Sequence, residues 1–264
     1  MNRLGSAMVV SSLIALLLQG CGSGESVGNP PAVKVDDNPS AAAPTRLRFA
    51  NYSPDTTSMD VELSRPGPGG TAPTVVSFTS VAKEAASVYA SLPVGSYTVK
   101  VTDHTSHVIL VSTILVVERG HSYTVFAYNK QSSTSGVKLL AVPEAIVKAP
   151  YGYEALRIVN LATGVPKVDV YVSNSGVNLA SSKPLYSGVV LGQYSTYDTL
   201  PFNIYHTIVT AAGQTTSVDF QTNLPGGGTQ PGLVVQSGQV MTLIIADSTG
   251  NPPIHIVANE DATN

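Results

Sequence analysis

The sequence predicts an all-β protein with two tandem immunoglobulin-like β-sandwich domains, which follow a signal peptide and a disordered tether. The first observation is composition, because only 12% of the residues are charged and Val, Ser, Thr, Gly and Pro are plentiful. The second is short runs in which apolar residues take every second position, with almost no helical pattern. The third is that these runs recur twice in the same order. Many short strands separated by turns are typical of two-sheet sandwiches.

Eight alternating runs in the first half are expected to form strands. Tyr97, Val99 and Val101 illustrate the pattern, because alternate side chains of a strand point to one face and so enter one core. Turns rich in Gly and Pro, such as residues 66–70 and 94–96, separate the runs. The expected strands cover residues 47–51, 59–63, 75–78, 87–90, 97–102, 108–117, 123–128 and 138–142.

An internal repeat relates the two halves. Residues 47–51 (Leu-Arg-Phe-Ala-Asn) match residues 156–160 (Leu-Arg-Ile-Val-Asn), and an Asp lies nine positions past each Asn, at Asp60 and Asp169. Further matches join 92–101 to 200–209 and 116–124 to 234–242, and a turn-rich insertion at 223–232 shifts the spacing between them. Ordered self-similarity of this kind indicates two copies of one structural unit.

The two copies define the expected domains. Pro143 and the Pro-Tyr-Gly-Tyr stretch at 150–153 interrupt the strand pattern, so the domains should cover residues 46–145 and 154–259. Each half has a common domain size and is expected to fold alone. The alternation also places Arg48 and Asp60 on outward faces of the first two strands. We therefore expect Arg48 to face Asp60, and Arg157 to face Asp169, across adjacent antiparallel strands.

Residues 1–20 have the layout of a secretory signal peptide. A positive start at Arg3 precedes an apolar run over residues 7–18, and small residues then lead to Cys21. A membrane-spanning helix needs ~20 apolar residues, so this shorter run favours a cleaved signal over a transmembrane anchor.

Residues 18–21, Leu-Gln-Gly-Cys, resemble a lipobox, the site where lipoprotein signal peptidase cuts. The resemblance implies a diacylglycerol thioether on Cys21 and a third acyl chain on its amine, and several chains anchor a protein firmly to a membrane. Cys21 is the only cysteine, so it has no intramolecular disulfide partner. Gly22, where an Asp would imply inner-membrane retention, favours the outer membrane if the source has one.

Residues 21–45 are expected to be a flexible tether between the lipid and the folded part. They are rich in Gly, Ser and Pro, show neither helix nor strand periodicity, and offer little apolar area to offset the entropy of ordering. A flexible segment of this length has a reach of ~25–30 Å.

Several motifs resemble the family called domain of unknown function 4397. Its pattern has a Ser-Pro-Asp turn, a Val-Asp-Val strand, a Pro-x-Gly-x-Tyr-x-Val stretch and a Gly-x-x-Tyr-Thr strand. The first copy carries these motifs at residues 53–55, 59–61, 93–99 and 120–124. The second copy keeps Val168–Tyr171 but has Ala-Thr-Gly at 162–164 and Met241 in place of the Tyr. The resemblance implies tandem β-sandwiches on secreted or surface proteins, and it brings no activity with it.

Charge and motifs argue against nucleic-acid binding and against catalysis. The net charge is −3 and no Lys/Arg cluster occurs, so the sequence offers no basic patch that would attract the phosphates of a nucleic acid. No Gly-x-Ser-x-Gly nucleophile elbow is present in the two expected domains, and the Gly-rich stretch at 225–228 lacks the Lys of a phosphate-binding loop. We therefore expect no cofactor and no enzymatic activity.

Asp103, His104 and His107 are the best candidates for metal ligands. Two imidazoles and a carboxylate can make a three-ligand site, but the trio lies on an expected turn between strands, where such residues are more often solvated. We therefore expect no metal site there. The remaining histidines, His121, His206 and His255, are isolated in the sequence.

Tyrosines offer a second candidate surface. Tyr151, Tyr153, Tyr194 and Tyr197 could stack on sugars or contact a protein, although ordinary strand packing is the favoured interpretation. The sequence thus predicts a non-catalytic bacterial cell-envelope lipoprotein that presents two β-sandwiches for binding, adhesion or assembly with an envelope protein or glycan. The alternatives are a carbohydrate-binding module and an accessory subunit of an envelope enzyme. Recognition is expected in the loops at 64–74 and 223–232.

Overall fold

The structure is a computed structural model that describes residues 34–35, 45–67, 73–130, 132–144, 147–174, 177–215, 219–221, 233–235, 237–248 and 254–260. The signal peptide, Cys21, most of the tether and the loop at 223–232 lie outside these residues, as does part of the loop at 64–74. Every regular element within the described ranges is a β-strand. No helix in those ranges is long and apolar enough to cross a membrane.

The first sandwich consists of two sheets. The first outer sheet has the order β4-β3-β7-β8, built from Thr74–Ala82, Ser58–Arg65, Gly95–Asp103 and Ile109–Val117. The first inner sheet has the order β10-β9-β2-β5, with β6 also paired to β2, built from Lys138–Glu144, Ser122–Tyr128, Arg46–Asn51, Ala85–Ala86 and Ala90–Ser91. Strands β2 and β9 run parallel, whereas their neighbours run antiparallel.

Alternate residues of these two sheets form the first core. Phe49 and Val125 of the inner sheet pack with Met59, Tyr97 and Val101 of the outer sheet, and all five are buried. The hydroxyl of Tyr97 donates a hydrogen bond to the carbonyl of Pro93 at 2.7 Å, so this buried phenol is satisfied locally.

The second sandwich repeats this plan. The second inner sheet has the order β15-β12-β20-β21, with β16 paired to β12, built from Gln193–Tyr194, Tyr153–Asn160, Val240–Asp247, Ile254–Glu260 and Asp198–Pro201. The second outer sheet has the order β14-β13-β17-β18, with β19 paired to β17, built from Tyr186–Val190, Lys167–Ser173, Asn203–Ala211, Phe220–Gln221 and Leu233–Val235. Strands β12 and β20 are the parallel pair.

Its core also joins one sheet to the other. Leu156, Ile158 and Leu243 of the inner sheet pack with Val170 and Val209 of the outer sheet. The all-β tandem sandwich fold expected from the sequence is therefore confirmed.

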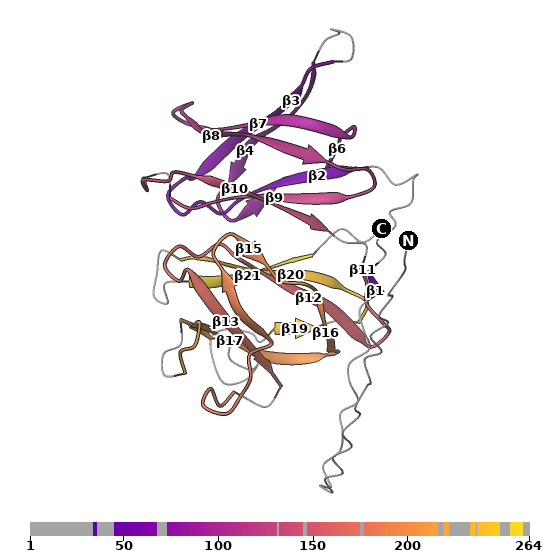
Figure 1. The fold of residues 1–264 in the computed structure, drawn as a ribbon, viewed down its shortest axis with the longest axis vertical. Helices are drawn as coiled ribbons and strands as arrows, with labels where there is room; N and C mark the ends of the chain where they lie inside the picture. Colours follow the sequence, from indigo (N-terminus) through magenta and orange to yellow (C-terminus); the bar gives the residue numbers. More distant parts are fainter. Residues whose placement is uncertain are drawn as a thin grey trace, which may run out of the picture.

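The two sandwiches contact each other through their inner sheets. In the described residues the four large sheets stack in the order outer, inner, inner, outer, as Figure 1 shows from top to bottom. The contact is apolar, and we call it the seam. It comprises Ala50, Tyr52, Phe126, Tyr128 and Val142 of the first sandwich and Val159, Leu161, Ile244 and Ala246 of the second. The inner sheets are thus buried on both faces.

Most expected strands of the first half occur within one or two residues of their expected bounds. One expectation is wrong: residues 87–89 lie outside any strand, between the short strands β5 and β6. The backbone N–H of Ser87 still donates to the carbonyl of Phe49 at 2.8 Å, but the Ser87 hydroxyl, in place of a backbone carbonyl, accepts from the N–H of Phe49 at 3.0 Å. The alternation of apolar and polar residues predicted a strand here, and that pattern does not show that a side chain takes the place of a backbone acceptor.

Two further expectations about connections are corrected. Pro143 does not interrupt a strand but lies in β10. Because β10 is an edge strand, a proline without an N–H can be accommodated there without the loss of a hydrogen bond between strands. Within the expected tether, Lys34–Val35 forms β1 and pairs antiparallel with β11, Val147–Lys148, which lies in the segment that links the two sandwiches. Such pairing rests on backbone hydrogen bonds, which the composition of the tether does not reveal.

Candidate functional site

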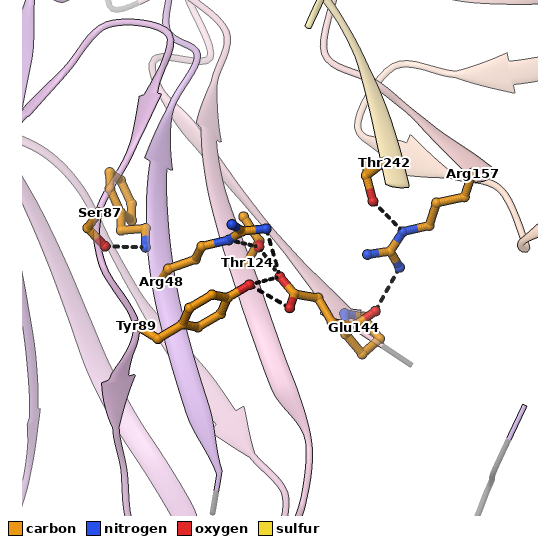
Figure 2. Close-up of polar contacts among 9 residues, drawn as sticks. Arg48, Ser87, Tyr89, Thr124, Glu144, Arg157 and Thr242 are labelled. Atoms are coloured by element: carbon orange, nitrogen blue, oxygen red, sulfur yellow. Dashed lines mark hydrogen bonds and ion pairs between the residues drawn. The ribbon is translucent and has the colours of Figure 1, made fainter. Parts of the chain in front are cut away.

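A buried polar cluster lies where the first inner sheet meets the second sandwich. Arg48 on β2 and Glu144 at the end of β10 form an ion pair with Nη2 and Oε1 3.1 Å apart, and the Glu144 side chain has no exposed surface. The Glu144 carboxylate also accepts hydrogen bonds from the Tyr89 hydroxyl, at 2.7 and 2.6 Å, and from the Thr124 hydroxyl. Figure 2 shows these side chains converging on the carboxylate.

The second sandwich places Arg157 at the matching position. Its Nε donates to the Thr242 hydroxyl at 2.8 Å, as Arg48 Nε donates to the Thr124 hydroxyl at 2.8 Å. Arg157 Nη1 donates across the seam to the carbonyl of Pro143 at 2.7 Å (Figure 2). Both arginines therefore hold the end of β10, one through the side chain of Glu144 and the other through the backbone beside it.

An aromatic ring covers each arginine. The guanidinium carbon of Arg48 lies 4.7 Å from the ring centroid of Tyr89, and that of Arg157 lies 4.6 Å from the centroid of Tyr197. A desolvated guanidinium over an aromatic face is stabilised by the charge distribution of the ring.

The expected pairs Arg48–Asp60 and Arg157–Asp169 are wrong. Strands β2 and β3 belong to different sheets, as do β12 and β13. The arginines point away from the core toward the seam, whereas the aspartates lie on the outer sheets, so the thickness of a sandwich separates them. Alternation shows that a residue faces away from its core, but it does not show to which of the two sheets the strand belongs.

The two aspartates instead fix a bulge in each outer sheet. Asp60 accepts a hydrogen bond from the N–H of Ser80 at 2.8 Å, and Asp169 accepts one from the N–H of Gly188 at 2.6 Å. Ser80 has a φ of 52° and Gly188 a φ of 65°, and the strand register shifts beside each aspartate. A repeated carboxylate therefore stabilises a repeated kink.

Other matched positions make the same contacts. The Asn51 side-chain amide donates to the carbonyls of Thr56 and Val81, and that of Asn160 donates to those of Val165 and Val189. Each asparagine side chain also accepts a backbone N–H two residues along the chain. The hydroxyl of Tyr205 donates to the carbonyl four residues before it, as that of Tyr97 does.

The residues considered as metal ligands are engaged in other contacts. His104 Nδ1 lies 2.8 Å from Asp60 Oδ1. Asp103 caps its turn by accepting hydrogen bonds from the N–H groups of Thr105 and Ser106, and the Ser106 bonds hold the pKa of its carboxyl below the usual range. His107, at φ 57°, is exposed at the end of that turn. The described residues contain no group of three or more potential ligands.

The isolated histidines occupy separate places. His121 in the first sandwich lies 4.0 Å from the carboxylate of Glu118. His206 belongs to β17 and His255 to β21 of the second sandwich.

The four tyrosines considered as a binding strip have different environments. Tyr197 covers Arg157 and packs with a small apolar cluster, while Tyr194 has its ring centroid 5.8 Å from the same guanidinium and is 41% exposed. Tyr151 is 98% exposed on the turn after the linker, and Tyr153 begins β12. Two of the four thus gather around one arginine, where they have a packing role.

A cleft of about 510 Å³ opens where the two sandwiches meet, beyond the apolar part of the seam. Turns at matching positions of the repeat form its two sides, Pro54 and Asp55 in the first sandwich and Thr163 and Gly164 in the second. The rest of the lining consists of the loop residues Lys130 and Ser132, Asp247 at the end of β20, and Ser248 just after it.

Hydrogen bonds to the turns fix the two carboxylates of this cleft. Asp55 accepts from the backbone and the hydroxyl of Ser132, at 3.1 and 2.8 Å. Asp247 accepts from the Thr163 hydroxyl at 2.5 Å and from the Gly164 N–H at 3.0 Å. The cleft therefore presents fixed acceptors, hydroxyl groups and the ammonium of Lys130, a set that suits hydrogen bonding to a polar ligand.

Four residues of these two sites are not expected from the sequence: Tyr89, Glu144, Lys130 and Asp247. A signal for Glu144 was available, because an acid directly after an apolar run reading Leu-Leu-Ala-Val-Pro is placed for burial and needs a cation. No pattern in one sequence indicates that residues 55 and 247 meet across two domains.

Residues 45–171 match the family model described as Domain of unknown function (DUF4397). The chain contains a DUF4397 domain. The DUF4397 match includes every strand of the first sandwich from β2 to β10, and it continues through β12 into β13. No curated protein sequence matches the chain.

Carbohydrate-binding modules and a fimbrial protein are among the solved structures that overlap the DUF4397-containing chain. One is a family 26 carbohydrate-binding module of Eubacterium rectale Amy13K in complex with maltoheptaose, with 12% identity, 83% of this chain and 98% of that chain covered, and a TM-score of 0.25. Another is the tip fimbrial protein Mfa3 of Porphyromonas gingivalis, with 10% identity, 83% and 98% covered, and a TM-score of 0.25. A streptococcal family 41 carbohydrate-binding module overlaps at 11% identity, with 80% and 96% covered and a TM-score of 0.23.

Proposed function

We propose that this protein is a lipid-anchored, non-catalytic binding protein of the bacterial cell envelope, with outer-membrane placement if the source has an outer membrane. The second sandwich is, in this proposal, a diverged second copy of the DUF4397 domain. The recurrence of Arg–Thr, Asp–bulge and Asn–turn contacts at matched positions supports that relationship.

The main support for the proposed binding role is the cleft between the turns at residues 54–55 and 163–164. Most of its lining residues have polar side chains, it is built from both sandwiches, and its carboxylates are held in place before any ligand arrives. A site fixed in advance loses less entropy when it binds a ligand. A hydroxyl-rich envelope glycan, or a polar loop of an envelope protein, supplies the donors and acceptors that this lining needs.

Binding through the cleft is tested with residues 22–264, which keep every described strand. This fragment is applied to immobilised envelope glycans and to envelope extracts. Lys130→Glu reverses the one exposed ammonium that lines the cleft and is expected to weaken binding about tenfold or more. Lys138→Glu changes an exposed lysine of β10 outside the cleft and serves as the matched control. Equal loss in both variants would contradict the placement of the site.

Lipid anchoring is tested separately in cells. A palmitate analogue should label the natural chain and fail to label Cys21→Ser. Equal labelling of both chains would disprove anchoring at Cys21 while leaving the proposed cleft untouched.

The absence of catalysis is part of the same proposal. It is supported by the engagement of the turn histidine and aspartates in local hydrogen bonds. Reproducible turnover by the purified protein, lost on His104→Ala or His107→Ala, would overturn it.

A further inference from the structure

Strand β8, Ile109–Val117, forms one edge of the first outer sheet. In the part of the chain that the structure describes, β8 pairs with β7 alone. It is nine residues long and contains neither a charged residue nor a proline. An edge of this kind presents a row of backbone donors and acceptors to any strand that can approach it.

The side chains along β8 are unusually apolar for an exposed edge. Ile109 is 59% exposed, Ile114 63% and Val116 59%. A small cavity of about 130 Å³ also opens between β8 and β10, and aliphatic residues such as Val99, Leu115 and Leu139 make up most of its lining. The side of the sandwich next to β8 is therefore incompletely covered.

Other edges of the molecule carry the features that discourage pairing. Strand β10 includes Lys138, Pro143 and Glu144. Strand β4 is kinked at Ser80, where φ is positive. The strands that occupy the place of β8 in the second sandwich, β18 and β19, are two and three residues long. Among the described edges, β8 alone combines length, lack of charge and exposed aliphatic side chains.

We infer that β8 is a self-association edge, on which the β8 strand of a second copy of this chain docks antiparallel. The pair is centred on Thr113, so Val111 lies opposite Leu115 of the second copy on the core-facing side. On the outward side, Ser112 lies opposite Ile114 of the second copy.

A second copy fits this edge better than an unrelated strand for reasons of charge and symmetry. At the centre of an antiparallel self-pair a residue faces its own copy, so a charge there would be repelled; the central residue of β8 is the uncharged Thr113, and no other residue of the strand is charged. In this register Arg119 of the second copy lies opposite His107, at the end of the turn that carries the opposite charge of Asp103. The arrangement is a closed twofold dimer, because each copy uses the same edge, which the other copy then covers.

The inference is tested by sedimentation velocity on residues 22–264 over a range of concentrations. The contact is a single strand pair and smaller than a standard interface, so we expect micromolar dimerisation. Ile114→Lys should raise the dimer dissociation constant about tenfold or more, because the two copies would then place two ammonium groups on the same outward face of the joined sheet, where they repel each other. Val75→Lys alters a 51% exposed valine on β4, the opposite edge of the same sheet, and should leave dimerisation unchanged.

A crosslink gives an independent readout. The fragment has no natural cysteine, so Ser112→Cys combined with Ile114→Cys should yield a disulfide-linked dimer, whereas Ser112→Cys alone should not. A wild-type monomer at all concentrations, or a dimer that Ile114→Lys leaves intact, would overturn the inference. A monomer that instead binds an added extended peptide through β8 would also overturn it, in favour of a foreign strand as the occupant.

Discussion

Two arginines at matched positions lie buried beside the seam, Arg48 at 8% and Arg157 at 2% exposure. Burying a guanidinium is unfavourable unless hydrogen bonds and an opposite charge compensate for the lost water. Arg48 has the Glu144 carboxylate, the Thr124 hydroxyl and the ring of Tyr89. The surroundings of Arg157 include the Thr242 hydroxyl, the Pro143 carbonyl and Tyr197.

Removal of one member of the Arg48–Glu144 pair should be costly. Arg48→Met removes the cation that lies 3.1 Å from the buried Glu144 carboxylate, so the free energy of unfolding should fall by about 3–5 kcal/mol. In the double variant Arg48→Met with Glu144→Leu, the loss should be smaller than the sum of the two single losses, because neither charge then remains. Urea unfolding of the four chains measures this coupling. Strictly additive losses would show that the pair is not energetically linked.

The seam tyrosine Tyr52 should make stability depend on alkaline pH. Burial raises the pKa of Tyr52 to about 12 from 10.0, so the folded state favours the neutral phenol. A folded-state pKa above the unfolded value contributes stability that is complete below pH 10 and is lost as the pH rises toward 12. We expect Tyr52→Phe to lose less stability than the natural chain between pH 9 and pH 11. Parallel pH profiles of the two chains would contradict this role.

The bulge on each outer sheet is an element that the two sandwiches share. Ser80 and Gly188 both have positive φ, a conformation that glycine adopts without the strain that a Cβ atom brings. Ser80→Gly should therefore leave the bulge intact and raise stability by up to about 1 kcal/mol. Gly188→Ala should lower it, since a Cβ there would also lie 2.9 Å from Lys167 Cε. Thermal melts of both variants distinguish these opposite signs.

The positions of strands follow from the sequence, whereas the grouping of strands into sheets does not. Residues such as Tyr97, Val99 and Val101 mark a strand and its core face without reference to the rest of the chain. Whether Asp60 faces Arg48 depends on which sheet β3 joins, which is decided by packing far along the chain. Ser87 departs from its expected strand because a hydroxyl replaces a backbone acceptor.

The seam left a signal in the sequence that alternation alone does not capture. Val125–Tyr128 on β9 and Leu243–Ala246 on β20 are continuous apolar runs, which are typical of strands covered on both faces. Such runs predict that something covers the inner sheets. They do not indicate that the two copies cover each other, because a partner protein would leave the same pattern.

At the scale of the whole molecule, the seam makes the two sandwiches depend on each other. Phe126, Leu161 and Ile244 are almost fully buried between them. We still expect each half to fold alone, since each has a complete core of its own. Each separated half should melt at a lower temperature than the intact chain, because it exposes its seam face to water. Halves that melt at the temperature of the whole would show that the seam contributes nothing.

We expect the seam to join the two sandwiches into one rigid unit, which positions the cleft between them. Differential scanning calorimetry of residues 22–264 tests this most directly. A coupled unit should unfold in one transition whose calorimetric and van't Hoff enthalpies agree. Two resolved transitions, each with the enthalpy of a single sandwich, would contradict the claim.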